Sequence, residues 1–499
     1  MERVNIMWFR RDIRLKDNRA LEAALAGGLR VLPLFIFDTV ILDQLPSRED
    51  KRVSFIHKAL TNLNTDLAAQ TGIKDSLLCL HGRPAEVFEF LLNGIVSGKS
   101  LITEKHSLII EDVYCGDDYE PYALERDNEV AALLHAKGIG LHKIKDHVIL
   151  SPREVLKADG NPYTIYTPYS KLWRTTLAGD REKLLKIASL PALSGKIFPA
   201  AEVLISADEE QLSSNIPVLN SQSKTSSVAA VRIYNSIPRL ADIGFNECES
   251  PDASWIPDFS VIDNYGKTRD FPAIEKGTTG IGVHLRFGTV SIREAAAIAL
   301  EHNDTWLGEL IWREFFQQII FNFPHSATGS FKRQYDNIEW RNDEAEIERW
   351  MAGETGYPLV DAGMRELNTT GHMHNRVRMV VASFLTKHLL VDWRIGEAYF
   401  ASKLLDYDLA SNVCNWQWAA GSGCDAAPYF RVFNPTEQAR KFDPAGRYTK
   451  RWVPELNSKA DLQSLFTPGT GTGKYPAPIV DHKFARERAL ATYAKALKG

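Results

Sequence analysis

The sequence predicts an α/β N-terminal domain followed by an all-α C-terminal domain, and three observations indicate this division. In the first third of the chain, short runs rich in β-branched and aromatic residues alternate with stretches of helical periodicity. From residue 236 onward, apolar residues recur mainly at helical spacing. Between these parts lies an irregular segment, in which Ser213–Val228 is rich in serine and asparagine and predicts a linker. The expected boundaries are 1–165, 166–235 and 236–499.

The N-terminal domain is expected to contain a five-stranded parallel, Rossmann-like sheet, because strands that alternate with helices form parallel sheets covered on both faces. The candidate strands are Val4–Phe9, Arg30–Phe37, Ser76–Leu80, Ser107–Val113 and the segment around His147–Leu150. No GxGxxG pattern follows the first strand, so an ordinary dinucleotide site is not indicated. The strand leads instead into the basic loop Trp8–Asn18. Its arginines either brace the loop through Asp12 and Asp17 or line a ligand cleft at the carboxyl end of the sheet.

Composition argues against several classes of protein. Lysine and arginine number 59 and aspartate and glutamate 63, so the net charge of −4 gives no general case for nucleic-acid binding. The stretch 431–452 is nevertheless mostly basic, which fits either a solvated face or a rim that contacts phosphates. Five scattered cysteines without a CxxC pair argue against a disulfide framework and a cysteine metal site. There is neither a signal-peptide pattern nor an apolar run of membrane-spanning length, so we expect a cytoplasmic protein.

The stretch Lys403–Pro435 combines carboxylates, amides, two tryptophans and an arginine in an apolar background. Polar groups at this density are costly to bury unless they are partnered, so the stretch is either a structural network or a site. Its residue order resembles the flavin-binding segment of the photolyase/cryptochrome family. It is most similar to the class I photolyases that repair cyclobutane pyrimidine dimers. The resemblance covers nearly the whole chain and implies FAD in the helical domain and light-driven DNA repair by electron transfer from reduced FAD.

A loop rich in glycine and threonine precedes a helix within 264–291, and the backbone NH groups of such a loop suit a phosphate. The family holds the flavin diphosphate with a similar loop. Two positions that usually carry a basic residue and a serine are Gly280 and Gly282 here, which would leave more of the task to backbone donors. The resemblance implies as cofactor-binding residues Tyr265, Thr278, Thr279, Gly280, Ile281, Gly282, Trp306, Arg378, Asp406, Tyr407, Asp408 and Asn412.

An amphipathic helix is predicted over Trp306–Phe321, with Glu309 and Trp312 one turn apart on one face. The resemblance implies that Glu309 hydrogen-bonds a flipped thymine and that Trp312 stacks on it. The implied catalytic residues are Glu309, Trp312, Asn375, Met379 and Asn412. The implied DNA-binding residues are Arg269, Glu309, Trp312, Arg376, Trp418 and Arg431. No metal is expected, because His372 and His374 form an i, i+2 pair without further ligands.

Three tryptophans, Trp340, Trp393 and Trp416, match the family's electron-transfer chain from flavin to surface. For any single tryptophan, burial in a helical core is the better explanation. Three matches in separate motifs favour the chain.

A second chromophore is implied for the N-terminal domain, because the FRRDIRL signature (residues 9–15) resembles that of family members with a light-harvesting antenna. Some relatives contact a folate through an Asn-Glu pair, and the corresponding places here are Tyr122 and Ala123. This departure weakens the folate assignment and leaves a deazaflavin or an empty cleft open.

Two alternatives share the fold and the cofactor. A cryptochrome photoreceptor would perform no repair, but plant cryptochromes have an aspartate at the place of Asn412, which faces flavin N5 in the family. A (6-4) photolyase would use a histidine pair in the pocket, whereas Met379 with Glu309 and Trp312 fits the dimer-specific pattern.

A third alternative, a non-catalytic single-strand-binding protein, would combine stacked aromatics with a basic groove. It would not explain the pairing of Arg378 with Asp406 that the resemblance implies. The expected partner is DNA containing pyrimidine dimers, bound by a monomer that does not associate with membranes.

Overall fold

The computed structural model describes residues 2–96, 108–200, 231–248, 257–457, 465–466 and 475–498, and they fall into two compact units. The first unit comprises Met1–Ile149, Leu185–Ser250 and Phe287–Glu294. The second comprises Leu150–Leu184, Pro251–Arg286 and Ala295–Gly499. The predicted linker 166–235 contributes two helices to the second unit and a strand to the first, and Ser213–Val228 lies outside the described residues.

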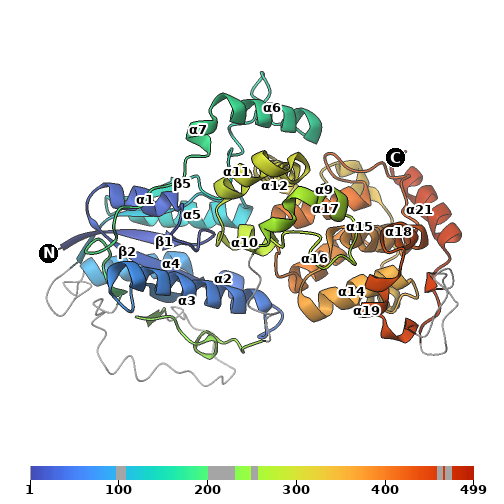
Figure 1. Ribbon diagram of the computed structural model, residues 1–499, viewed down its shortest axis with the longest axis horizontal. Helices are drawn as coiled ribbons and strands as arrows, with labels where there is room; N and C mark the ends of the chain where they lie inside the picture. Colours follow the sequence, from blue (N-terminus) through green and yellow to red (C-terminus); the bar gives the residue numbers. More distant parts are fainter. Residues whose placement is uncertain are drawn as a thin grey trace. The chain divides into compact units, whose positions relative to one another are not determined.

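The first unit is built on one six-stranded sheet in the order β5-β4-β1-β2-β3-β6, of which Figure 1 labels β1, β2 and β5. The strands are β1 (Glu2–Phe9), β2 (Arg30–Asp38), β3 (Leu78–Gly82), β4 (Leu108–Gly116), β5 (Gly140–Ile144) and β6 (Arg232–Tyr234). Every neighbouring pair from β5 to β3 is parallel, and β6 runs antiparallel to β3. The predicted α/β class is therefore confirmed, with a mixed sheet in place of a purely parallel one.

Two details of the predicted sheet were wrong. The fifth strand is Gly140–Ile144, whereas His147–Leu150 is a buried loop. An apolar run signals burial but does not distinguish a strand from packed coil, and the actual edge strand GLHKI carries polar residues that hide its character. The antiparallel β6 has only three residues, too few for a recognisable pattern. Of the other predicted limits, Ser107 lies outside the described residues.

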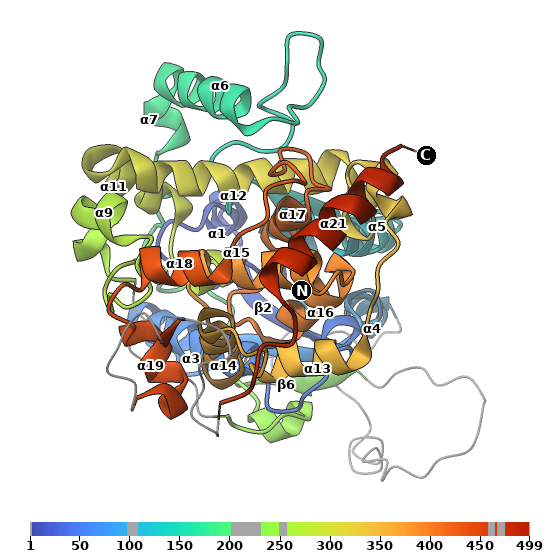
Figure 2. The same ribbon diagram turned by 90° about the vertical axis from the view of Figure 1, so that its right-hand side faces the viewer.

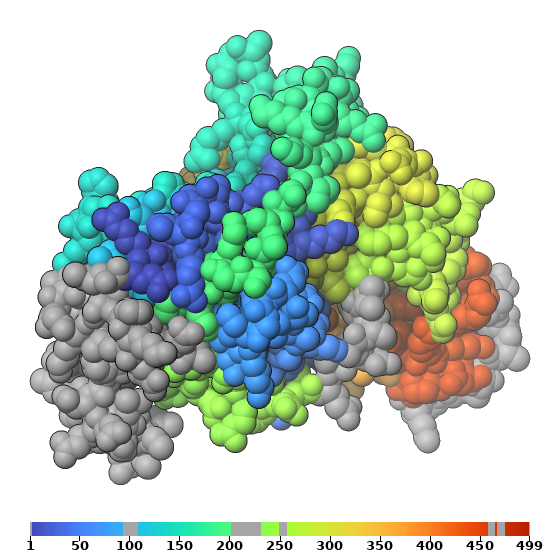
Figure 3. Space-filling view, turned by 60° about the vertical axis from the view of Figure 1, so that its left-hand side comes forward, coloured from blue at the N-terminus to red at the C-terminus, as the bar shows by residue number. Residues whose placement is uncertain are grey.

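Helices of the first unit cover both faces of the sheet, and Figure 3 shows the outer surface of one of them, α3, in medium blue. Their bounds are α1 (Arg19–Ala26), α2 (Thr39–Leu42), α3 (Lys51–Thr71), α4 (Pro84–Val96) and α5 (Pro121–His135). Side-chain caps set where they begin: Asn18 accepts from Leu21 N in α1, and Asp50 accepts from Arg52 N in α3.

The regular elements described in the second unit are helices joined by loops. Its helices are α6 (Tyr166–Gly179), α7 (Arg181–Leu184), α9 (Tyr265–Thr268), α10 (Gly282–Phe287), α11 (Ile292–His302), α12 (Asp304–Asn322), α13 (Glu344–Ala352), α14 (Pro358–Thr370), α15 (Asn375–Ser383), α16 (Trp393–Lys403), α17 (Leu409–Ala420), α18 (Pro435–Phe442), α19 (Arg447–Trp452) and α21 (His482–Ala496). The first residues of α11 and the last of α10 belong to the other unit. Among the helices described, none is long and apolar enough to cross a membrane.

Helices α15, α16 and α17 lie side by side at the centre of this unit (Figures 1 and 2). A π-turn, Phe384–His388, follows α15, and the chain then enters α16 at Asp392, whose carboxylate accepts from Arg394 N. Asp408 begins α17 in the same way by accepting from Ser411 N at 3.0 Å. These two aspartates therefore fix where both helices start, and with them the side chains that face the space between the helices.

Candidate functional site

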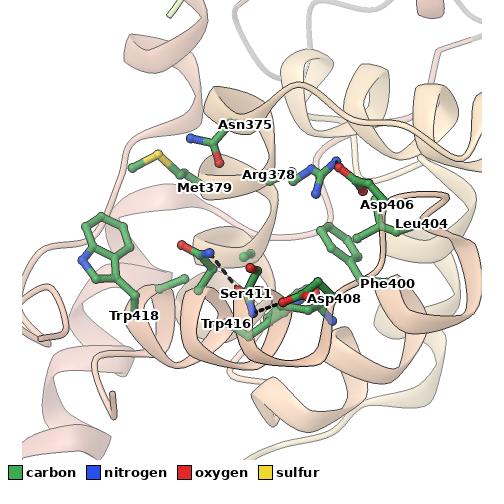
Figure 4. Close-up of a pocket in the computed structure, with 14 residues that line it drawn as sticks. Asn375, Arg378, Met379, Phe400, Leu404, Asp406, Asp408, Ser411, Trp416 and Trp418 are labelled. Atoms are coloured by element: carbon green, nitrogen blue, oxygen red, sulfur yellow. Dashed lines mark hydrogen bonds and ion pairs between the residues drawn. The ribbon is translucent and has the colours of Figure 1, made fainter. Parts of the chain in front are cut away.

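A cavity lies between α15, α16 and α17 (Figure 4). The walls combine apolar side chains with a few polar groups, as binding sites for planar organic groups do. The lining residues are Asn375, Arg378, Met379, Ala382, Phe400, Leu404, Asp406, Asp408, Ser411, Asn412, Asn415, Trp416, Trp418 and Ala419.

An ion pair between Arg378 and Asp406 closes one side of the cavity. One terminal nitrogen of Arg378 lies 3.0 Å from each carboxylate oxygen of Asp406, and Arg378 Nε donates to the Met373 carbonyl at 2.7 Å. Both members of the predicted pair thus meet. Because the guanidinium is bonded on both its Nε and terminal sides, it is held in one orientation.

The glycine-rich loop reaches the same ion pair. A Cβ atom on Gly282 would lie 2.8 Å from Asp406 Oδ2, closer than a Cβ atom tolerates. Gly280 has φ +66°, a left-handed conformation that favours glycine. Thr279 is buried, and its carbonyl accepts from Asp258 N at 3.1 Å. The two glycines that depart from the family pattern are therefore required here by close approach and by backbone conformation.

Asn412 faces a carboxylate that the sequence did not single out. Its Nδ2 donates to Glu397 Oε1 at 2.9 Å and to the Glu397 carbonyl at 3.2 Å, and the Tyr407 hydroxyl donates to Oε1 at 3.4 Å. Burial raises the pKa of Glu397, although both hydrogen bonds act in the opposite direction. Glu397 stands one turn beyond Trp393 on α16, and no sequence pattern distinguishes it from other acidic residues of a helix.

Asp408 completes the polar end of the cavity. Besides capping α17, its carboxylate accepts from Gln317 Nε2 at 3.1 Å and lies 3.8 Å from an Arg286 nitrogen. Helices α10 and α12 are thereby tied to the start of α17.

A second cluster joins α9 to α12. The Arg269 guanidinium pairs with the Glu309 carboxylate, and it lies 5.4 Å from the centre of the Tyr265 ring. Burial raises the pKa of Glu309 even though Arg269 opposes the shift, and burial likewise raises the pKa of Tyr265. Among the described residues that line the cavity between α15, α16 and α17, neither Glu309 nor Trp312 occurs. Trp306, predicted to bind the cofactor, is buried against Phe259 at the start of α12.

Trp312 stacks face to face on Tyr166 of α6, with ring centroids 3.6 Å apart and planes 4° apart. Its indole is only partly buried. Nothing in the sequence pattern pointed to Tyr166, because the two rings are 146 positions apart.

The N-terminal turn of α15 presents Asn375, Arg376 and Met379, of which Asn375 and Met379 line the cavity. Arg376 pairs with Asp270 at 2.7 Å, and its guanidinium lies 4.2 Å from the Phe442 ring centre. His374 caps this helix, with Nδ1 accepting from Arg376 N at 3.2 Å. Burial lowers the pKa of His374 to about 4, so the ring is neutral and able to accept at neutral pH.

No group of three or more potential metal ligands occurs among the described residues. His372 lies instead near Glu366 of α14, with 3.7 Å between Nδ1 and Oε1.

The three predicted electron-transfer tryptophans lie in elements that contact one another. Trp416 lines the cavity, and its ring presses on α16, where a Cβ on Gly396 would lie 2.2 Å from Trp416 Cη2. Trp393 is the first residue of α16 and is buried. Trp340 is only half-buried and packs edge-on against Tyr493 at 5.9 Å.

Two hydrogen bonds connect the segment after Trp340 to the residues just before α16. Arg341 N donates to the Leu390 carbonyl at 2.8 Å, and Asp392 N donates to Asn342 Oδ1 at 2.9 Å. Of the three tryptophans, Trp416 lines the cavity and Trp340 is the most exposed.

Some of the basic residues in the stretch predicted to contact DNA phosphates form ion pairs with acidic residues of the same chain. Arg431 is exposed, with its guanidinium 5.4 Å from the Phe433 ring centre, and Trp418 is 6.5 Å from the same ring. Arg440 pairs with Glu437 at 2.6 Å and Arg451 with Glu275 at 3.0 Å. The positive field of the 431–452 stretch is therefore weaker than the sequence suggested.

In the first unit, the basic loop after β1 is braced mainly by acids from other elements. Arg10 pairs with Asp127, Arg14 with Asp146, and Asp17 with Arg293. The predicted partner Asp17 thus takes part through another arginine, while Asp12 accepts from the Arg10 backbone at 2.8 Å.

A small cavity lies beside this loop, at the carboxyl ends of β1, β4 and β5. Burial raises the pKa of Asp12, one of its lining residues, to about 6. Tyr122, in the place of the folate-contacting asparagine, donates its hydroxyl to Asp38 at 2.6 Å, and Ala123 is buried.

Comparison with known proteins decides the family. Residues 5–192 match the family described as DNA photolyase, and residues 306–495 match the FAD binding domain of DNA photolyase. The deoxyribodipyrimidine photo-lyase of Synechococcus sp. is 36% identical over 98% of this chain and 96% of its own. The chain belongs to the photolyase/cryptochrome family. The deoxyribodipyrimidine photo-lyase of Escherichia coli, another member, is 34% identical over 99% of both chains.

Solved structures of the family show the same fold. A bacterial class III photolyase from Agrobacterium tumefaciens is 31% identical, with a TM-score of 0.74 over 100% of this chain and 98% of its own. An archaeal photolyase from Sulfolobus tokodaii, solved with two FAD molecules, is 30% identical, with a TM-score of 0.75 over 99% of this chain and 100% of its own. The cavity between α15, α16 and α17 lies within the part of this photolyase-family chain that matches the FAD binding domain.

Proposed function

We propose that this protein is a deoxyribodipyrimidine photolyase that splits cyclobutane pyrimidine dimers in DNA, driven by light. The observation that carries the proposal is the cavity between α15, α16 and α17, which the Arg378–Asp406 pair, Asn412 and apolar side chains line together within a matched FAD binding domain. The residues present fit a flavin. Phe400, Leu404 and Trp416 suit its aromatic body, and a charged pair and an amide suit its polar edge.

When bound, reduced FAD supplies the chemistry, by giving one electron to the dimer after absorbing light and taking it back once the ring has split. The protein contributes position and environment. Arg378 and Asp406 would hold the polar edge of the ring, and the loop 278–282 would offer backbone donors to the diphosphate, since Gly280 and Gly282 leave its backbone uncovered. Phe400, Leu404 and Trp416 line the cavity and would shield a bound flavin from water.

The substrate must leave the DNA stack to reach the cofactor, as it does in photolyases generally. We propose that Trp312 and Trp418 stack on the extruded bases and that Glu309 accepts a hydrogen bond from one of them. Burial favours a protonated Glu309, while its Arg269 partner favours the carboxylate; the ion pair in this structure supports the carboxylate as acceptor. Arg376 and the exposed Arg431 are proposed to contact phosphates, with Asn375 and Met379 against the lesion.

Light sensing by a photoreceptor with the same fold is the second candidate function, and the amide of Asn412 argues against it. An amide at this place donates to Glu397 and cannot release a proton as an aspartate could. Among solved structures, a Synechocystis cryptochrome matches at 23% identity, which indicates the shared fold alone.

Further proposals concern the antenna and the state in which the protein acts. We propose that the carboxyl edge of the first unit's sheet accepts an antenna, a deazaflavin in preference to a folate, because Tyr122 is engaged with Asp38 and Ala123 offers no carboxylate. We also propose that the protein works as a monomer in the cytoplasm, since its substrate is DNA.

The test is repair of an oligonucleotide carrying one thymine dimer by the purified, chemically reduced protein. Repair under blue light and none in the dark is expected. Preferential binding to the dimer without repair in the light would favour the photoreceptor over the enzyme.

A further inference from the structure

Tyr166 and its aromatic neighbour Phe315 hold the indole of Trp312 in a fixed plane. Tyr166 lies 3.6 Å from the indole, centroid to centroid, with the two planes 4° apart. Phe315 stands edge-on to both rings, 5.8 Å from Tyr166 and 5.6 Å from Trp312. A half-buried indole therefore has one face fully covered and its plane fixed by two aromatic neighbours.

Tyr166 is itself held at both ends. Its hydroxyl donates to the Gly308 carbonyl at 2.9 Å, one turn before Trp312 on α12. Its backbone NH donates to Asp425 Oδ2 at 3.0 Å. The residue at the N-cap of α6, Ile165, has no side chain that can cap the helix, so the Asp425 carboxylate supplies the missing acceptor from the loop after α17.

We propose that Tyr166, fixed by Asp425, is a positioning residue of the repair site that holds Trp312 in the plane required for stacking on the extruded base. This inference rests on the proposed function, because it gives Trp312 its role. The covered face of the indole cannot accept a base, so the stack leaves a single face for the substrate. Restricting a stacking ring in advance lowers the entropy lost on binding, which favours the flipped dimer over undamaged DNA.

Binding of two oligonucleotides, one with a single thymine dimer and its undamaged twin, tests the proposal on FAD-loaded protein. Tyr166→Leu should weaken dimer binding by about threefold to tenfold, the equivalent of one lost aromatic pair, and leave undamaged binding and FAD content unchanged. Tyr166→Phe keeps the stacked ring and should bind the dimer as the unsubstituted protein does. Tyr163→Leu is the matched control, because Tyr163 packs edge-on against Tyr169.

A double-mutant cycle separates positioning from a merely structural role. In a Trp312→Leu background, Tyr166→Leu should cause no further loss of dimer affinity. Asp425→Ala should repeat the selective loss, and Asp425→Asn, which keeps an acceptor oxygen, should not. If Tyr166→Leu does not fold, the Asp425→Ala and Asp425→Asn variants still test the proposal.

Full additivity in the cycle, an equal loss on both oligonucleotides, or an unchanged dimer affinity in Tyr166→Leu would each overturn the proposal. Failure of the proposed function would be visible beforehand, because the unsubstituted protein would then fail to repair the dimer in light, with or without preferential binding, and both proposals would fall together.

Discussion

The side-chain amide of Asn412 donates to the carboxylate of Glu397, with 2.9 Å between Nδ2 and Oε1. Glu397 is a half-buried acid whose pKa is raised by burial, and the amide is the group that keeps the contact favourable when that acid is ionised. An aspartate in place of Asn412 would set two carboxyl groups against each other at the wall of the proposed flavin site.

Asn412→Asp should therefore create a carboxyl pair that binds one shared proton at neutral pH, because two adjacent carboxylates cannot both ionise freely. The absorbance spectrum of the bound flavin, recorded against pH, should show a transition that the unsubstituted protein lacks. In Asn412→Asp/Glu397→Gln the transition should move back towards acid pH. A single variant whose spectra match those of the unsubstituted protein at every pH would show that Asn412 lies away from the flavin.

Glu309→Ala should retain FAD and lose affinity for dimer-containing DNA. A hydrogen bond to a desolvated base contributes about 1–3 kcal/mol, which corresponds to roughly 5- to 150-fold in the dissociation constant. Glu309→Gln keeps the size and an acceptor oxygen, so it should lose less. Binding to dimer and undamaged oligonucleotides by fluorescence anisotropy measures both variants. If Glu309→Ala binds the dimer as tightly as the unsubstituted protein, Glu309 has no place in the substrate site.

Trp416→Phe should abolish light-driven reduction of oxidised FAD by an external reductant, because Trp416 is the cavity-lining member of the proposed chain to Trp340. Repair by chemically pre-reduced enzyme should continue, since the electron passed to DNA does not use that chain. Trp350→Phe is the control. Trp350 is buried and packs edge-on against Trp416 at 6.2 Å, but it is no member of the chain, so this variant should still photoreduce. Equal photoreduction rates in both variants would show that the chain is wrongly assigned.

The stability of the protein should fall as the pH drops from about 6.5 towards 4, in part through His374. Burial lowers the pKa of this histidine to about 4 in the folded protein, so the unfolded chain binds the proton first. The stabilisation is complete above the unfolded pKa of about 6.5 and is lost as the folded value is approached. Protonation of His374 also removes the cap of α15, because a protonated Nδ1 can no longer accept from Arg376 N.

His374→Asn keeps a capping acceptor and removes the titration. Between pH 7 and pH 5, the unsubstituted protein should lose about 2 kcal/mol more of its free energy of unfolding than this variant, as measured by urea denaturation. Burial also lowers the pKa of His388, to about 3, so both proteins should retain some dependence on pH. An identical dependence in the two proteins would mean that His374 titrates normally.

The sequence was most informative where a physical pattern repeats. Alternation of strands and helices predicted the sheet, and helical periodicity predicted the second unit. The edge strand β5 could not be recognised because its side chains are polar, and the antiparallel β6 because it is too short.

Within the candidate site, resemblance pointed correctly to the pairing of Arg378 with Asp406. It did not indicate Glu397, which resembles any acidic residue of an amphipathic helix until the fold turns it towards Asn412. The role of Tyr166 could not be predicted from the sequence, because its contact with Trp312 depends on how α6 and α12 pack and not on any local pattern.

The most direct test of the central proposal is the action spectrum of repair. Purified, reduced protein should repair dimer-containing DNA per incident photon in proportion to the absorbance of its bound chromophores across the near-ultraviolet and blue. Arg378→Met, which leaves Asp406 without its partner, should lose bound FAD and repair together. Repair that proceeds equally in the dark, or that persists in flavin-free protein, would contradict the proposal that this chain is a flavin-dependent photolyase.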